Sequence, residues 1–399
     1  MITTQVDRLA WLRSAVQAGT VHTVRASFAD RLGHWRGKRV PAEHFLTHAD
    51  QELGFCDGML VCDVRCEIIE ETPYSNYGTG YPDFHVRFDP ARLRPVGWVS
   101  GEAYVFGDPH DHDGRPSPVS PRHVLRRVID RLESMGIRAR VGLRLGGRFM
   151  HDPDHAALIP FGGLGPGDNE VGALSRIGSG LQASEIPVLA IDSGPEAGAF
   201  RLTLTSDEPM ASAEAGVVAK AAAKEIARQA GVTASFMTLQ RHALAPSLLE
   251  PMVDLEITGL LQPAASAVKR RLSEVRALLQ PSVNAFKAGP PSAPTIRPEG
   301  RSLRVSGLSA SSEADPFTVI AAALAAIAVT IDSSHEPAGS IADAEGLEMA
   351  AERLARTAWA GEWLGPEFVA NALPLLARED RLLQSCVTDW EVERYWGTA

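Results

Sequence analysis

The clearest pattern in the chain is an alternation of apolar and charged positions in three short runs. In VGLRLGG, Val141, Leu143 and Leu145 share one face and Arg144 lies on the other. Because successive side chains of a β-strand point to opposite faces, this run predicts a strand with one buried and one charged face. Two further runs repeat the arrangement, with Phe200, Leu202 and Leu204 opposite Arg201, and Val253, Leu255 and Ile257 opposite Asp254 and Glu256.

Helical patterns lie between and around these strands. The Ala-rich run SAEAGVVAKAAAKEIARQAG predicts a helix closed by Gly231, and DPFTVIAAALAAIAVTI predicts another with Pro316 near its start. A third helix, RHVLRRVIDRLESMG, precedes the first strand. Strands with one polar face and helices behind the other face indicate a curved sheet, or half-barrel, around a cavity.

The N-terminal region has a different pattern. Residues 6–18 predict an amphipathic helix, and TVHTVRASFAD alternates as a strand that ends in a turn at Gly33. From Gly54 to Tyr104 the chain holds short alternating runs with little helical periodicity. We therefore expect an α+β protein with a small strand-rich domain, residues 1–104, followed by a larger domain, residues 105–399.

Composition narrows the class of partner. The chain has 399 residues, 45% of them hydrophobic, which is enough to bury a sizeable core. Its formal net charge of −10 disfavours binding to nucleic acid or to an anionic membrane, since both need clustered Lys and Arg. Four cysteines are too few to staple a chain of this length, and we interpret them as reduced thiols. With no signal-peptide or membrane-span pattern, we expect a cytoplasmic protein whose partner is a small molecule or a protein.

Local motifs for chemistry are weak. The Gly-rich run GGLGPGDNEVG lacks the Lys-Ser/Thr ending of a phosphate loop, and we interpret it as a flexible loop. HDPDH at 151–155 and PHDHDG at 109–114 have ligand-like spacing, but both lie in Pro-rich segments, which favours a solvated surface over a metal site. No G-x-S-x-G nucleophile motif is present.

The order of several segments resembles the glutamine synthetase family over most of the chain. VRASFADRLGHWRGKRVP is similar to that family's N-terminal β-grasp motif, and GYPDFHVRFDPARLRPVGW and GDPHDHDGRPSPVSPRHVL to the segments that lead into the catalytic domain. PMASAEAGVVAKAAAKEIARQAGVTASFM resembles the long helix and following strand, PSVNAFKAGPPSAP the Asn-Ser-Tyr-Lys loop, and CVTDWEVERY the C-terminal helix.

This resemblance implies a β-grasp domain followed by a glutamine-synthetase-type α/β domain with a curved antiparallel sheet. It also implies rings of six or twelve subunits with active sites between neighbours. The implied reaction phosphorylates the side-chain carboxylate of glutamate with ATP, after which ammonia displaces the phosphate. Divalent cations held by glutamates and a histidine support that chemistry.

The family's ligand positions carry other residues here. The first acidic pair falls on Arg144 and Gly146, and the acids that end a later segment fall on Gly194 and Arg201. The family's His-x-His segment falls on Asp254 and Glu256, and its lysine after Phe-Met falls on Leu239. The Asn-Ser-Tyr-Lys loop keeps Asn284 and Lys287, and the arginine-rich segment keeps only Arg301 and Arg304.

Guanidinium groups carry a fixed charge and no lone pair for coordination, so Arg144 and Arg201 predict that the family's Mg²⁺ ions and Mg-ATP are lost. The leading hypothesis is therefore a protein without ligase chemistry. It would act as a scaffold, as a regulatory or hetero-oligomeric partner of an active relative, as a homo-oligomer, or as a binder of a small anion. One alternative is an enzyme that uses an arginine-lined pocket, without metal or ATP, on a carboxylate-bearing metabolite. Another is a divergent ATP-dependent γ-glutamyl amide ligase.

We expect Arg144 and Arg201 to share the polar face of the sheet. There they would pair with acids such as Asp192, Asp254 and Glu256, or bind an anion, because an unpaired buried arginine would cost several kcal/mol. Asp30 either caps the hairpin turn or reaches a neighbouring subunit's site, and the turn is favoured. The candidate ligand-binding residues are Arg144, Arg201, Asn284, Lys287, Arg301, Arg304 and Asp30, and no metal-binding residue is predicted.

Overall fold

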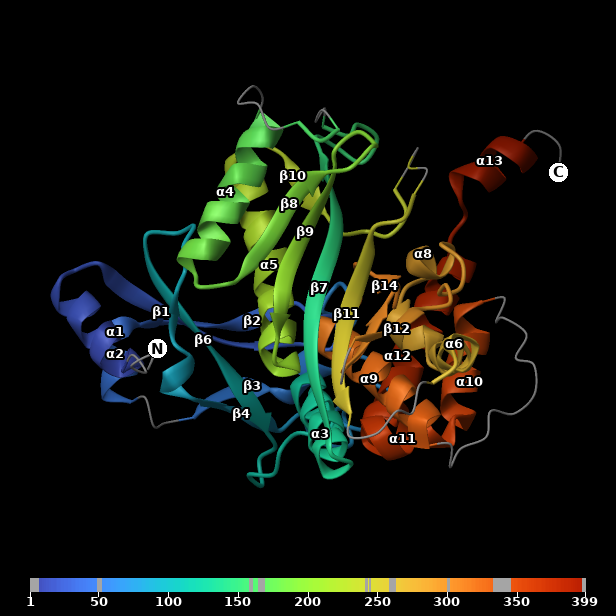
Figure 1. The fold of residues 1–399 in the computed structure, drawn as a ribbon, viewed down its shortest axis with the longest axis horizontal. Helices are drawn as coiled ribbons and strands as arrows, with labels where there is room; N and C mark the ends of the chain where they lie inside the picture. The colour runs from blue at the N-terminus through green and yellow to red at the C-terminus, as the bar shows by residue number, and fades with distance from the viewer. Residues whose placement is uncertain are drawn as a thin grey trace.

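Two sheets make up the framework of this computed structural model. It describes residues 7–48, 52–157, 161–163, 169–240, 243, 245–257, 263–299, 302–332 and 346–396. The N-terminal sheet lies beside the long central strands, and helices cover one side of those strands (Figure 1). The predicted fold class, an α+β protein with a β-grasp domain and a curved antiparallel half-barrel, is confirmed. The division of the chain at residues 104 and 105 stays a prediction.

The first sheet has the order β2-β1-β6-β4-β3, with β5 paired to β6. Its β1–β6 pair is parallel and its other pairs are antiparallel. Helices α1 and α2 pack on it through the apolar side chains around Leu12 and Phe45. The elements are α1 (Arg8–Gln17), β1 (Val21–Ala29), β2 (Trp35–Pro41), α2 (Ala42–Thr47), β3 (Leu53–Cys56), η1 (Asp57–Leu60), β4 (Asp83–Phe88), η2 (Pro90–Arg92), β5 (Arg94–Pro95) and β6 (Gly101–His110).

The β1–β2 hairpin requires glycine at one position. Gly37 has a φ of +155°, and a Cβ atom there would lie 2.2 Å from the carbonyl oxygen of Ala26 on β1. The turn is closed by Asp30, whose buried carboxylate accepts from the backbone N–H groups of Leu32 and His34. Of the two roles considered for Asp30, the structure thus shows the one in the turn, where the hairpin itself occupies the carboxylate.

The second sheet is antiparallel, in the order β12-β13-β11-β7-β9-β8, with β10 paired to β7 and β14 to β11. The three alternating runs of the sequence are strands β7, β9 and β11, as predicted. The strands are β7 (Ile137–Met150), β8 (Val188–Ser193), β9 (Ala199–Asp207), β10 (Thr233–Ser235), β11 (Leu248–Ile257), β12 (Thr295–Glu299), β13 (Ser302–Ser306) and β14 (Ala310–Ser311).

The apolar face of this sheet packs on helices, chiefly α3, α5 and α9. Helix α9 is buried from Pro316 to Val329, and its many alanines let neighbouring elements approach closely. The helices are α3 (Pro121–Ser134), α4 (Asn169–Ala183), α5 (Pro209–Gln229), α6 (Ala265–Glu274), α7 (Arg276–Leu279), α8 (Val283–Phe286), α9 (Pro316–Asp332), α10 (Leu347–Arg356), α11 (Ala358–Leu364), α12 (Pro366–Ser385) and α13 (Asp389–Tyr395).

A buried arginine connects the first sheet to two helices that pack on the second sheet. The guanidinium of Arg122, at the start of α3, donates to Asp108 on β6 and to Glu214 on α5. Its side chain is 3% exposed, so the ion pairs are shielded from water. Because α5 also contacts β2, β7 and β9, this cluster fixes α3, α5 and the first sheet relative to one another.

Two sequence interpretations need correction. The Gly-rich run predicted to be a flexible loop ends inside a helix, because α4 begins at Asn169; residues 164–168 of that run lie outside the described part. His110 is not on a solvated loop: it ends β6, is buried, and its Nδ1 contacts the carbonyl of Asp108 at 2.8 Å. Within the described ranges, no helix is long and apolar enough to cross a membrane.

Candidate active site

The face of the second sheet that points away from the helices carries the charged residues singled out in the sequence. On β7, Val141, Leu143 and Leu145 are fully buried against the helices, and Arg144 lies on the opposite face with 42% of its side chain exposed. Arg201 on β9 lies on the same face, 47% exposed. We call this the open face of the sheet.

Strand register sets acids opposite these arginines. Arg144 faces Glu250 on β11, and the side chains form an ion pair of 3.3 Å. Arg201 faces Asp192 on β8 and pairs with it at 2.5 Å. The predicted pairing with acids on neighbouring strands is thus confirmed, although the partner of Arg144 is Glu250 and not Asp254 or Glu256.

The alternation of charge continues along β11. Arg140 and Arg138 of β7 face Asp254 and Glu256, which extends the series begun by Arg144 and Glu250. Asp254 also faces Arg304 on β13 and accepts from its guanidinium at 2.7 Å. The open face is therefore a set of alternating guanidinium and carboxylate groups spread over neighbouring strands.

The two glycines at former ligand positions have structural roles. Gly146 opposes Arg201 across the β7–β9 pair, and an added Cβ there would lie 3.1 Å from the backbone nitrogen of Leu248. The backbone N–H of Gly194 donates to the carbonyl of Ala199, which closes the β8–β9 turn. Neither position offers a side chain to a ligand.

The remaining candidates are not brought together. The side-chain amide of Asn284 accepts from the backbone N–H of Leu239 at 2.8 Å and donates to its carbonyl at 2.9 Å, so it is occupied by the protein itself. Lys287 follows α8 and is exposed, Asp30 closes the hairpin turn, and Arg301 lies outside the described residues.

The residues present do not fit a divalent cation. Among the described residues, no group of three or more His, Cys, Asp or Glu side chains is placed to hold a metal ion, including the HDPDH and PHDHDG segments. The carboxylates of Glu250, Asp192 and Asp254 each face a guanidinium, whose fixed positive charge opposes a metal ion nearby.

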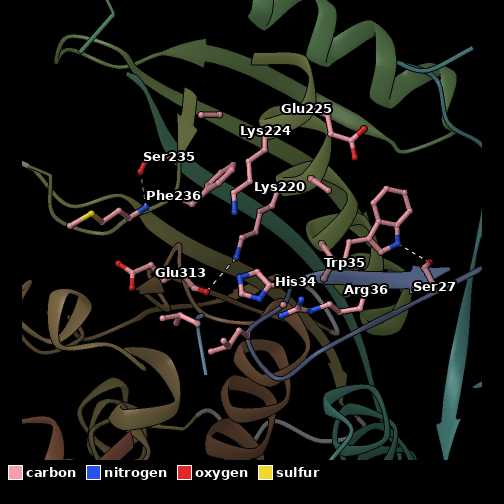
Figure 2. A pocket seen from close by; sticks show the side chains of 18 of the residues that line it. Ser27, His34, Trp35, Arg36, Lys220, Lys224, Glu225, Ser235, Phe236 and Glu313 are labelled. Atoms are coloured by element: carbon pink, nitrogen blue, oxygen red, sulfur yellow. Dashed lines mark hydrogen bonds between the residues drawn. The ribbon is translucent and has the colours of Figure 1, made fainter. Parts of the chain in front are cut away.

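A separate cavity of about 720 Å³ lies on the helix side, between the β1–β2 hairpin, α5 and β10. Figure 2 shows Lys220 and Lys224 of α5 pointing past Phe236 toward His34 and Arg36 of the hairpin. We call this the lysine cavity. Sequence reasoning missed it, because two lysines one turn apart in an Ala-rich helix have the pattern of a solvated face.

Both lysines lie in an unfavourable environment for positive charge. Lys220 is 6% exposed, and its ammonium donates to the backbone carbonyls of Ala314 at 3.2 Å and Glu313 at 3.5 Å. Burial, reinforced by the neighbouring charge of Lys224, lowers the pKa of Lys220 to about 8. Burial also lowers the pKa of Lys224.

Comparisons with known proteins show the fold and the proteins that this chain resembles. No family model matches the chain. It is 26% identical to a γ-glutamylethanolamide synthetase of Streptomyces coelicolor, over 96% of this chain and 94% of that protein. It is 22% identical to a glutamate–isopropylamine ligase of a Pseudomonas species, over 96% and 97%. Along nearly its whole length the chain resembles ligases of the glutamine synthetase type.

Solved structures show the same fold. A GmaS/ADP complex superposes with a TM-score of 0.77 at 20% identity, covering 97% of this chain and 99% of that one. A glutamine synthase homologue superposes with a TM-score of 0.78 at 17% identity, covering 94% and 98%.

These relatives overturn two expectations. The prediction of a protein without ligase chemistry is wrong, because the relatives that align along nearly the whole chain are named as a synthetase and a ligase, and two that align over shorter parts of it are named as a ligase and a synthase. The prediction that Mg²⁺ and ATP are not used is wrong for the same reason. Substitution at the aligned positions was therefore a poor guide to activity.

The arginines of the open face were expected to be buried, but their ion pairs are exposed to solvent. Breaking such a pair should therefore lower the free energy of unfolding by less than expected. Both side chains of the Arg144–Glu250 pair reach solvent, so Arg144→Met should lower the free energy of unfolding by less than about 1 kcal/mol. The Arg122→Met variant should lose more, about 3 kcal/mol, because it removes a buried guanidinium that donates to both Asp108 and Glu214. Urea unfolding of the two variants beside the wild type measures both values, and equal losses would contradict this assignment.

Asp315, beside the lysine cavity, should make stability depend on pH. Burial raises the pKa of its carboxyl to about 7, although Thr318 donates two hydrogen bonds to it. Its proton therefore stabilises the fold below about pH 4, and this contribution is lost as pH rises through about 7. Asp315→Asn keeps the acceptor for Thr318 but cannot titrate. The melting temperature of the variant, relative to that of the wild type, should rise between about pH 4 and pH 7.5. Parallel melting curves across that range would contradict the assigned shift.

Proposed function

We propose that this protein is an ATP-dependent ligase that joins the γ-carboxylate of glutamate to an amine. The observation that carries the proposal is the alignment, over more than nine-tenths of both chains, with relatives named for γ-glutamyl amide synthesis. Support comes from the half-barrel fold shared with the GmaS/ADP complex. The relatives' names mention ethanolamide, isopropylamine, methylamine and anilide, so the class of amine stays open.

The open face has chemistry suited to anionic substrates. Guanidinium groups bind carboxylates and phosphates through two parallel hydrogen bonds. Arg144, Arg201 and Arg304 are each about half exposed, and each already holds a carboxylate of the protein. Such a pair can exchange its internal carboxylate for that of a substrate at low cost, because exposed pairs contribute little to stability. We therefore assign these arginines to binding glutamate or the phosphates of ATP.

The assay of this activity should include divalent metal ions. The implied divalent cations would neutralise phosphate charge, but the described residues do not form a site that fits them. The arginines of the open face would add to that neutralisation, acting on the carboxylate and phosphate groups of the substrates.

The proposal is tested with the purified full-length protein, glutamate, ATP and Mg²⁺, and a panel of ammonia, methylamine, ethanolamine and isopropylamine. Mass spectrometry should detect a γ-glutamyl amide of one amine, with ADP released in equal amount. Arg201→Gln should reduce kcat/KM at least tenfold, which corresponds to about 1.4 kcal/mol. The matched control is Arg356→Gln, which removes an 81% exposed arginine on α10 and should leave the rate unchanged.

Absence of amide and of amine-dependent ADP release with every amine, in protein that melts cooperatively, would refute the proposed activity. Equal rates for the wild type and Arg201→Gln would instead refute the role given to the open face.

We further propose that the protein is a homo-oligomer, since glutamine synthetase family members are typically oligomeric. Helix α13 extends from the body of the subunit (Figure 1), and apolar side chains in and beside it are exposed, including Val387, Trp390 and Trp396. Light scattering should give a mass that is a multiple of 42.8 kDa. Trp390→Ser should weaken the assembly if α13 contributes to a contact, and a monomeric wild type at micromolar concentration would contradict the proposal.

A further inference from the structure

The lysine cavity has the features of a binding site that the ligase reaction does not use. It lies on the helix side of the second sheet, whereas the arginines assigned to substrate lie on the opposite, open face. Its volume of about 720 Å³ is in the range of pockets that hold small organic molecules.

The two lysines of the cavity form no ion pair. Among the described residues, no carboxylate lies within ion-pair distance of Lys220 or Lys224; the first donates to backbone carbonyls and the second lies over the Phe236 ring, 5.9 Å from its centroid. The nearest lining acids are already engaged. Glu313 accepts from the backbone of Thr238 and from Ser282, and Glu225 binds Arg25 and Trp98.

Two like charges one helical turn apart destabilise a helix, and here the burial of Lys220 adds to the cost. The lowered pKa values of both lysines reflect the same strain. An anion bound between the two ammonium groups would reduce their repulsion. The site should therefore bind a ligand with more than one negative charge.

The shape of the charge distribution favours phosphate over carboxylate. A planar carboxylate is best bound by the fork of a free guanidinium, but Arg36 already donates to Asp30 at 2.8 Å. His34 contacts Asp30 through Nδ1 at 3.1 Å, which leaves Nε2 for a ligand. Two separate ammonium groups and this imidazole suit a tetrahedral dianion, since ammonium acts as a compact point charge. Phe236 and the half-buried Trp35 add apolar walls.

We propose that the lysine cavity binds the phosphate group of a small organic phosphate monoester, with Lys220, Lys224 and His34 holding the phosphate and Phe236 and Trp35 contacting the organic part. The ligand would bridge the β1–β2 hairpin to α5 and β10.

Isothermal titration calorimetry with phenyl phosphate, inorganic phosphate and benzoate tests this. Phenyl phosphate should bind more tightly than inorganic phosphate, and benzoate should bind at least tenfold more weakly than phenyl phosphate. Lys224→Gln should weaken phenyl phosphate at least tenfold, and Lys224→Arg should retain most of the affinity. The Lys224 side chain reaches solvent at the cavity, so these variants should fold, which thermal melting checks.

Two controls separate this site from the ligase site. Lys269→Gln on α6 removes a lysine that does not line the cavity and should not change binding. Arg201→Gln on the open face should not change it either. No binding of either phosphate at millimolar concentration, or affinity lost in Arg201→Gln but kept in Lys224→Gln, would overturn the proposal without bearing on the ligase activity.

Discussion

The two-faced character of β7 is the constraint on which the second sheet depends. Val141, Leu143 and Leu145 are buried against the helices, and the residues between them face away. Because strand side chains alternate, a shift of one residue would bury Arg144 and expose three core positions at once. The same register brings Glu250, Asp254 and Glu256 of β11 opposite the arginines of β7. Core packing and the charge pattern of the open face are therefore fixed together.

Much of this framework could be predicted from the chain. The alternation around Arg144 and Arg201 identified strands and faces correctly, since burial of one face gives a strong local signal. The partner of Arg144 could not be predicted, because Glu250 lies 106 residues away and strand register is a tertiary property. The acids considered in the sequence were close by on β11, but the register places Asp254 opposite Arg140 and Arg304, and Arg304 donates to it.

The candidate sites show how positional comparison can mislead. Replacement of the family's acids by Arg144, Gly146, Gly194 and Arg201 suggested lost chemistry, whereas the relatives aligned along the chain are named as ligases. A comparison of aligned positions shows which residues differ from the family. It does not show which charged groups the folded sheet still carries on that face. The lysine cavity was missed for a related reason: its cations come from one helix, but the hairpin that encloses them comes from the other sheet.

The contact between Asn284 and Leu239 has a mechanical consequence. One side chain satisfies both backbone groups of a residue 45 positions away, through two hydrogen bonds of opposite direction. The segment after β10 and the short helix α8 are thereby coupled as one rigid unit, and neither can be displaced alone without leaving a donor and an acceptor unsatisfied. Since β10 and Ser282 also line the lysine cavity, a displacement of that wall would be transmitted as a whole to the loop that follows α8.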